Sequence, residues 1–146
     1  IGGQDIDLVE WGLAPDLLAQ VKRLGRVDDG VRDALYSGAS SFLFFSRCEG
    51  FGYPMVEASR QGCPSIAWKK TTADEIFRDV IPLLEKLDAK EGARMMFDYQ
   101  NMDEVKRGEL RGKLIKCSMD FSGTDTGSGF MAAVQAAIAR KDQRAN

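Results

Sequence analysis

The chain of 146 residues contains no histidine, and this absence excludes several mechanisms at once. A Ser-His-Asp or Cys-His catalytic group uses an imidazole as its general base, so neither can be built from this chain alone. The three cysteines, Cys48, Cys63 and Cys117, cannot all pair with one another, and their spacing fits no zinc motif. We therefore expect reduced cysteines, as in a cytoplasmic protein, and no metal site.

Long hydrophobic runs and an excess of charge of one sign are also missing. No apolar run approaches the ~20 residues of a membrane span, and no signal peptide is recognisable. The net charge is −2, which gives no strong attraction to nucleic acid or to anionic lipid. We expect a protein with no transmembrane segment and no nucleic-acid partner, located in the cytoplasm or peripherally at a membrane.

What is present is the composition of an ordinary globular domain, with 44% apolar and 29% charged residues. A chain of this length can bury a core of its own. It begins at Ile1–Gly2–Gly3, which resembles the tail of a strand whose body is missing. We predict that residues 1–146 form one domain, incomplete at its N-terminus, of a larger protein.

The most informative stretch of the sequence predicts a strand, a glycine-rich turn and a helix. Ser41–Phe45 is apolar throughout, which favours a buried strand. Pro54 suits a first helical turn and Gly62 suits the residue after a helix end, so a helix is predicted between them. Gly50 and Gly52 lie between the strand and the helix. This arrangement is common at phosphate sites, because free backbone N–H groups and the positive helix end face the anion.

Two carboxylates bracket the turn. Glu57 falls about one turn into the predicted helix, where a negative charge favours the helix dipole and can have a purely structural role. Glu49 lies just before the first glycine, at the end of the predicted strand. A carboxylate beside a buried strand is costly unless it is paired or in contact with water. Because ligands bind at the carboxyl ends of such strands, Glu49 is a candidate binding residue.

The neighbouring segments extend this pattern to alternating strands and helices. Strands are predicted at 21–26, 41–45 and 64–68, and helices at 14–21, 28–37 and 54–61, the second of which Asp28 or Asp29 can cap. The first of these strands is expected to end at Gly25, and the helix after it to turn Val31, Leu35 and Tyr36 inward. The alternation predicts an α/β fold, a Rossmann-like parallel sheet with helices on both faces. Because they are apolar throughout, the strands at 41–45 and 64–68 are expected in the sheet interior.

After Trp68 the pattern is looser. Thr71 or Thr72 can cap a helix over residues 74–77, and Glu75 either completes a capping box with Thr72 or binds a ligand. Further helices are predicted at 80–87, 102–115 and 130–139, with a last strand at 93–97. The segment 122–129 is rich in glycine, serine and threonine but follows no clear buried strand. We therefore interpret it as a linker rather than as a second phosphate loop.

The stretch around the two glutamates resembles a known signature. Residues 49–57, followed by Ala58 and by Gly62–Cys63–Pro64, resemble the E-x7-E motif of retaining glycosyltransferases of the GT-B fold, especially family 4. The flanking blocks also match, at Leu24–Val27, Leu35–Tyr36, Gly38–Ala39, Pro64–Ala67 and Asp74–Ile76. The agreement runs from about Leu24 to Ile76, and a motif within the predicted strand, turn and helix is more specific than a lone G-x-G.

The resemblance implies a function that needs a second domain. GT-B enzymes have two Rossmann-like halves around a cleft, and this chain resembles most of the C-terminal half, which binds the nucleotide-sugar donor. A retaining, hexosyltransferase-type enzyme would pass the sugar to an acceptor glycan, lipid-linked sugar or small molecule held by a missing N-terminal domain. No cofactor and no metal are implied, because helix N-termini and basic side chains supply positive charge. Arg47, Lys69 and Lys70 are candidates for that charge, or else solvated surface residues.

The resemblance also implies roles for single positions. Glu49 would act as the catalytic glutamate facing the donor sugar, and Glu57 would hold the ribose hydroxyls. The turn would present backbone N–H groups to the sugar and the diphosphate, through Gly50, Phe51, Gly52 and Tyr53. The segment before the 28–37 helix would lie beside the base, through Gly25, Arg26 and Val27.

Two alternatives remain open at this point. One is another GT-B enzyme, such as a sugar-nucleotide epimerase or a phosphorylase. The epimerases lack this glutamate spacing, and a phosphorylase would need a pyridoxal lysine site that the sequence does not show. The other is a nucleotide-binding or interaction module without catalysis, because half of the cleft lies outside this sequence.

Overall fold

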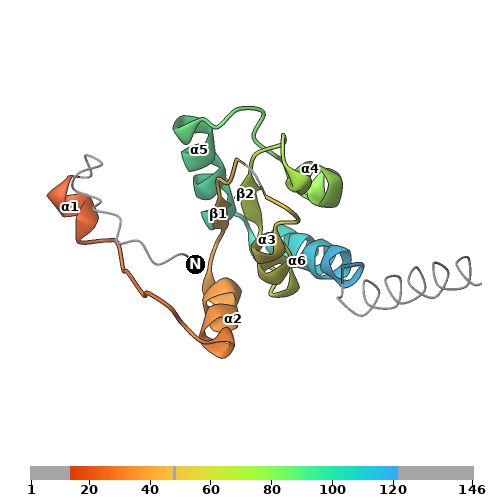
Figure 1. Ribbon diagram of the computed structural model, residues 1–146, viewed down its shortest axis with the longest axis horizontal. Coiled ribbons are helices and arrows are strands. Elements are labelled where there is room, and N and C mark those ends of the chain that lie inside the picture. Colours follow the sequence, from red (N-terminus) through yellow and green to blue (C-terminus); the bar gives the residue numbers. More distant parts are fainter. Residues whose placement is uncertain (1–13, 48, 122–146) are drawn as a thin grey trace, which may run out of the picture.

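The computed structural model describes residues 14–47 and 49–121, so the predictions for Cys48, the N-terminal strand tail, the 122–129 linker and the 130–139 helix lie outside it. The described residues form helices and two short strands in a mixed order (Figure 1). In chain order the elements are α1 (Pro15–Leu18), α2 (Asp29–Gly38), β1 (Phe42–Phe44), α3 (Tyr53–Arg60), β2 (Ser65–Ala67), α4 (Thr72–Phe77), α5 (Ala89–Gln100) and α6 (Glu104–Met119).

The two strands are parallel, which confirms the predicted α/β fold. Phe42, Leu43 and Phe44 of β1 stand opposite Ser65, Ile66 and Ala67 of β2. On the other side of β2, Trp68 forms a parallel bridge with Leu84. β2 therefore has backbone neighbours on both sides, and all three of its residues are buried. Its predicted interior position is confirmed.

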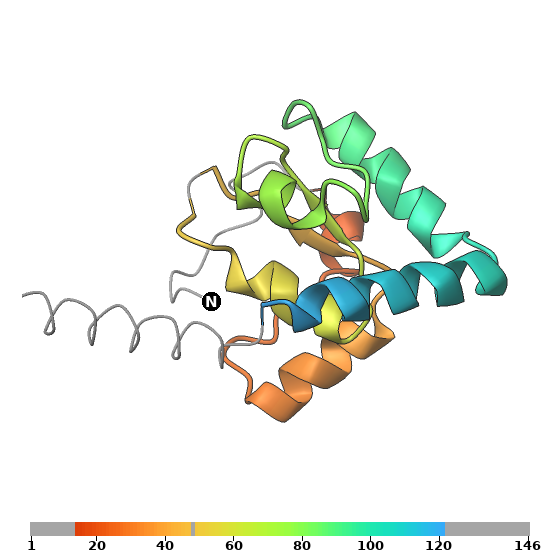
Figure 2. The same cartoon turned by 90° about the vertical axis from the view of Figure 1, so that its right-hand side faces the viewer.

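Helices cover both faces of this sheet (Figure 2). On one face Ala67 packs with Met55 of α3 and Phe77 of α4 in the larger core cluster. On the other face Ile66 packs with Met95 and Tyr99 of α5. Because side chains of a strand alternate between faces, a three-residue strand is enough to join the two clusters.

The interior position predicted for β1 is wrong within the described residues. Phe42 and Phe44 are half-buried, whereas Leu43 between them is exposed, with 42% of its surface accessible. The physical reason is that β2 is the only strand that pairs with β1 in the described part of the chain. A strand with one neighbour leaves its far edge and part of one face uncovered.

The beginning and end of α3 follow the sequence signals closely. Pro54 lies in the first turn, as predicted. Gly62 follows the helix with a φ of 74° and donates its N–H to Ser59 O, while Cys63 N–H donates to Ala58 O. This pair of bonds is a Schellman motif, in which a glycine takes the left-handed conformation after a helix.

The predicted helix after Asp28 is also confirmed, but its inward face is not. The Asp28 side chain caps α2 by accepting from Val31 N–H at 2.9 Å. Val31 and Leu35 are exposed, because no described element covers their side of the helix. Tyr36 does turn inward, and its ring meets Phe42 edge-on at 5.2 Å between ring centres.

Three predicted elements are wrong. Residues 21–26 form no strand, because no strand of the described residues lies beside them to share hydrogen bonds. Residues 80–87 form no helix; Leu84 forms a bridge beside β2, with its N–H bonded to Ala67 O and Lys69 N–H bonded to Leu84 O. Residues 93–97 belong to α5 instead of a strand, and Asp88 caps that helix. A short apolar run does not distinguish the two structures, whereas the buried Gly92, Met95 and Tyr99 have helical spacing.

The remaining helices are placed nearly as predicted. α1 is one turn long, shorter than the expected 14–21 helix. Thr71 caps α4, so the capping box of Thr72 with Glu75 does not form. α6 covers the predicted 102–115 segment despite its two glycines, and it packs against α3 with Leu114 and Ser118 buried. Most of its charged side chains are exposed, as expected of a solvated face.

Candidate functional site

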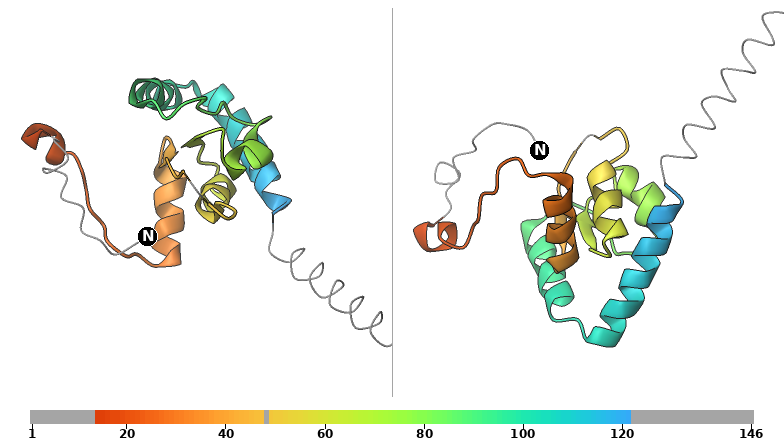
Figure 3. Two further views of the ribbon diagram at one scale, coloured as in Figure 1. Left: turned by 45° about the horizontal axis from the view of Figure 1, so that its top comes forward. Right: turned by 90° about the horizontal axis from the view of Figure 1, so that it is seen from below.

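The helices α2, α3 and α4 all begin at one end of the sheet, where the parallel strands stop (Figure 3). The glycine turn leads from β1 into α3, and residues 68–71 lead from β2 into α4. These connections leave the carboxyl ends of both parallel strands, where open α/β sheets bind their ligands. The predicted site therefore lies where several helix N-termini meet.

The turn depends on Gly52. This residue caps α3 with φ 81° and ψ 41°, in the left-handed region that residues with a Cβ rarely adopt. A Cβ there would lie 2.6 Å from Met55 Cε and 3.3 Å from Thr72 Oγ1. Gly50, in contrast, has no atom within 4 Å of the position a Cβ would take. The second glycine of the signature is a steric requirement and the first is not.

A hydroxyl from the next helix holds this turn in place. Thr72 Oγ1, in the first turn of α4, donates to Phe51 O at 2.9 Å. The Phe51 ring packs between Tyr53, at 4.9 Å between ring centres, and Phe121, at 5.6 Å. The turn is thus fixed to α4 by a hydrogen bond and to the end of α6 by ring contacts. The sequence around Thr72 predicts only a helix cap, and nothing in that local pattern indicates this longer-range bond.

The turn leaves several backbone donors free. Met55 N–H bonds back to Gly52 O at 2.9 Å, and Pro54 has no N–H. Within the described residues, no oxygen accepts from the N–H groups of Gly50, Phe51, Gly52 and Tyr53. Unpaired N–H groups before a helix, together with the helix dipole, are suited to hold an anion.

Glu49 is exposed to solvent. It follows β1 at a distance of several residues, and the described residues form no ion pair or hydrogen bond with its carboxylate. Because this carboxylate is in contact with water, its placement after the strand carries no cost that a ligand would have to relieve. Its position beside the free turn donors is the remaining argument for a role in binding.

Glu57 is half-buried and has a cationic neighbour that the sequence did not indicate. Its Oε1 lies 3.6 Å from Arg32 Nη1 of α2, and Arg32 also bonds to Asp29 at 2.9 Å and Asp33 at 3.2 Å. Partial desolvation opposes the charge of Arg32, but the Asp33 hydrogen bond and the nearby carboxylates outweigh it and raise the pKa of the guanidinium. Burial first, and then the charge of Glu57, raise the pKa of Tyr36. Glu57 is thus held by charge between α3 and α2.

The residues expected beside the base lie on the segment that leads into α2. Gly25 has a φ of 65° and Arg26 is exposed, while Val27 is half-buried. No hydrogen bond in the described chain joins them to the glycine turn. They lie at the same end of the sheet as the turn but are not bonded to it.

The basic candidates differ in how free they are. Lys69 forms an ion pair with Glu85, and the hydrogen bond from that pair raises the pKa of Lys69. The Lys70 ammonium lies over the Trp68 ring, 5.9 Å from its centre. Arg47 is exposed. Lys69 therefore already has a partner outside the turn.

The thiols that the structure describes are poor nucleophiles. Burial raises the pKa of Cys63 to about 11, and burial with the Asp120 charge raises that of Cys117. Both are free thiols. In the described residues, no three side chains of the metal-binding types come together, and no helix is long and apolar enough to cross a membrane.

Comparison with known proteins agrees with this geometry. Residues 3–91, more than half of the chain, match the family model described as glycosyl transferases group 1. The chain therefore belongs to the group 1 glycosyl transferases, a family that transfers glycosyl groups. The match includes the glycine turn, α3 and the Thr72 hydroxyl. No curated protein and no solved structure matches the chain.

Proposed function

We propose that this chain is the donor-binding, C-terminal half of a retaining GT-B glycosyltransferase of the family 4 type. It would bind a nucleoside-diphosphate sugar at the end of the sheet where α2, α3 and α4 begin, without a metal. The sugar would pass to an acceptor held by an N-terminal half of the complete enzyme. The observation that carries this proposal is the glycine turn, which lies within the family match and has its N–H groups unpaired within the described residues.

The electrostatics support an anionic leaving group at this end of the sheet. The free N–H groups of the turn and the positive end of the α3 dipole would hold the diphosphate and stabilise its charge as the glycosidic bond breaks. Gly52 lets the backbone approach closely, and Thr72 keeps the turn from moving away. Binding energy from a fixed turn is available in the transition state without further reorganisation.

The two glutamates would divide the recognition of the donor. Glu57, held near Arg32, would accept hydrogen bonds from the ribose hydroxyls and so fix the nucleoside. Glu49, exposed beside the turn, would face the sugar hydroxyls where charge develops at the anomeric carbon. Gly25, Arg26 and Val27 would lie beside the base through their backbone.

Calorimetric titration with nucleoside diphosphates, UDP and GDP, tests this assignment. We expect Glu57→Ala to lose a charged hydrogen-bond acceptor, roughly 1.5–3 kcal/mol, which raises the dissociation constant about tenfold to hundredfold. Glu49→Ala should bind the free nucleotide almost normally, because nucleoside diphosphates lack the sugar. In the complete enzyme it should instead lower turnover.

Two controls separate binding from unfolding. Glu109→Ala removes an exposed carboxylate from the middle of α6, far along the chain from the turn, and should change nothing. Circular dichroism of each variant should show the same thermal midpoint. Equal loss of binding in the Glu49 and Glu57 variants, or no loss in either, would contradict the assignment. Sugar transfer or donor hydrolysis by the complete enzyme separates a transferase from a non-catalytic module.

A further inference from the structure

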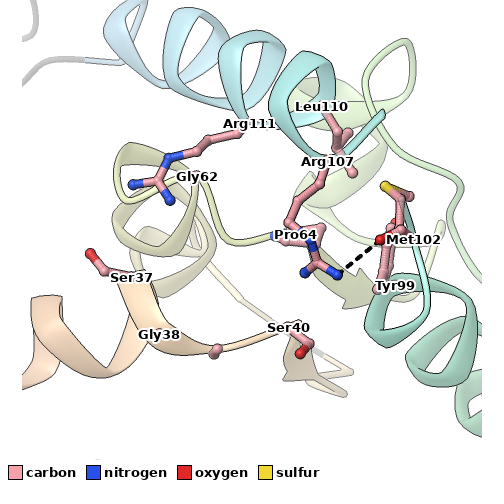
Figure 4. A pocket seen from close by; sticks show the side chains of 11 residues that line it. Ser37, Gly38, Ser40, Gly62, Pro64, Tyr99, Met102, Arg107, Leu110 and Arg111 are labelled. Atoms are coloured by element: carbon pink, nitrogen blue, oxygen red, sulfur yellow. Dashed lines mark hydrogen bonds between the residues drawn. The ribbon is translucent and has the colours of Figure 1, made fainter. Parts of the chain in front are cut away.

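A small cavity lies at the opposite end of the sheet, where the strands begin (Figure 4). It has a volume of about 120 Å³ and is bounded by the segment 37–40 before β1, by Gly62 and Pro64 before β2, and by residues of α5 and α6. The glycine turn follows β1 at its opposite end. The cavity is therefore separate from the proposed donor site.

The charged side chains that line this cavity are all basic. Arg107 and Arg111 stand one turn apart on α6; the Arg107 side chain extends toward Pro64, and the Arg111 side chain extends past Gly62 (Figure 4). No aspartate or glutamate lines the cavity. The acid nearest to Arg107 is Glu104, whose Oε1 lies 3.8 Å from Arg107 Nε and whose side chain is 93% exposed.

The fold fixes the guanidinium of Arg107, whereas for Arg111, an exposed residue, it positions only the stem. Arg107 Nη2 donates to Gln100 O at 3.2 Å and to Met102 O at 3.1 Å, which fixes the guanidinium against the end of α5. Its Nε is buried and forms no hydrogen bond. The stem of Arg111 passes directly over Gly62, close enough that a Cβ on that glycine would collide with it. An arginine with fixed orientation loses less entropy when it binds a ligand.

A buried hydroxyl provides the second observation. Tyr99 is 5% exposed and lines the cavity, yet its hydroxyl has no hydrogen-bond partner. Buried polar groups are rarely left unpaired, so an unpaired one at a cavity wall indicates a missing partner. Burial first, and then the charges of Asp98 and Cys63, raise the pKa of Tyr99 to about 12. The phenol therefore stays protonated and can donate.

We infer that this cavity binds a phosphate group, carried by inorganic phosphate or by a small phosphomonoester, through Arg107, Arg111 and the Tyr99 hydroxyl. Guanidinium groups match the geometry of phosphate oxygens, and charge-assisted bonds of this kind are the strong ones. A volume of about 120 Å³ has room for one tetrahedral anion. The bound anion would join α5 and α6 to the loops that begin the strands.

Thermal unfolding and calorimetry of the 146-residue chain with inorganic phosphate test the inference. We expect phosphate to raise the midpoint in a saturable way, beyond the effect of chloride at equal ionic strength. Arg111→Met keeps the stem over Gly62 and removes the charge, so the dissociation constant for phosphate should rise about tenfold. Lys113→Met, on the same helix but outside the cavity, is the matched control and should leave it unchanged.

A second variant keeps the test independent of folding defects. Tyr99→Phe removes only the unpaired hydroxyl, so the midpoint without phosphate should not fall, while phosphate affinity should fall severalfold. A parallel titration with glycerol phosphate distinguishes the two candidate ligands. Tighter binding of glycerol phosphate would indicate a phosphomonoester, and tighter binding of inorganic phosphate would indicate the free anion. An effect of phosphate no greater than that of chloride, or equal affinities in Arg111→Met and Lys113→Met, would overturn the inference. Arg111→Met should leave the affinity for UDP and GDP unchanged, so failure here and failure of the donor site are distinguishable.

Discussion

Replacing Gly52 with alanine perturbs the turn on which the proposed donor site depends. The φ of 81° places the new side chain in the left-handed region, at a cost of about 1–2 kcal/mol. The Cβ would also lie 2.6 Å from Met55 Cε, the end of a flexible but buried side chain, and shifting that methyl group costs a further ~0.5–1.5 kcal/mol. Alanine also lowers the conformational entropy of the unfolded chain, which stabilises the fold by about 0.4–1 kcal/mol. We expect the free energy of unfolding to fall by about 1–3 kcal/mol.

Two other glycines separate these contributions. Gly25 has a φ of 65° but open space around its Cβ position, so Gly25→Ala reports the backbone term alone, about 1 kcal/mol or less. Gly50 has neither a positive φ nor a close neighbour, and Gly50→Ala should be near neutral. Urea denaturation followed by circular dichroism measures all three variants. A loss in Gly52→Ala no larger than in Gly25→Ala would refute the steric argument.

Thr72→Val removes the hydroxyl that bonds Phe51 O, and urea denaturation should show a loss of about 1 kcal/mol that Thr72→Ser does not share. Equal losses in the two variants would show that the bond does not hold the turn. Asp103 caps α6, and hydrogen bonds from Lys106, first from its backbone N–H, lower the pKa of the Asp103 carboxyl. Such a group stabilises the fold above its unfolded pKa, and the effect disappears as the pH falls through the folded pKa. The wild type should therefore unfold at higher urea than Asp103→Asn near neutral pH, with the difference vanishing in acid. A difference that stays constant across the titration would contradict this.

Signals carried by neighbouring residues were sufficient for the helix boundaries around the site. Asp28, Pro54 and Gly62 act on backbone groups within one turn of themselves, and the structure places the ends of α2 and α3 where they predict. The glycine turn was predictable for the same reason, since the conformation of Gly52 is a local property. The parallel sheet followed from the alternation of elements.

Signals that depend on a distant partner were insufficient. Leu84 is extended because its N–H donates to Ala67 O and its carbonyl accepts from Lys69 N–H. The sequence around Pro82 does not indicate this pairing. The apolar run at 93–97 fits a strand or a helix, and packing of Met95 and Tyr99 against Ile66 selects the helix. Residues 21–26 have strand-like composition but no neighbouring strand within the described residues.

The sequence by itself determined the family, through the match over residues 3–91, and the glycine turn between two glutamates, because that turn lies within one short continuous segment. Only the tertiary structure brought Arg32 to Glu57 and the Thr72 hydroxyl to the turn. It also placed Arg107, Arg111 and Tyr99 around the cavity at the opposite end of the sheet, a site with no sequence motif. Contacts between remote segments arise from how helices pack on the sheet, and that packing depends on all the elements together rather than on any one of them.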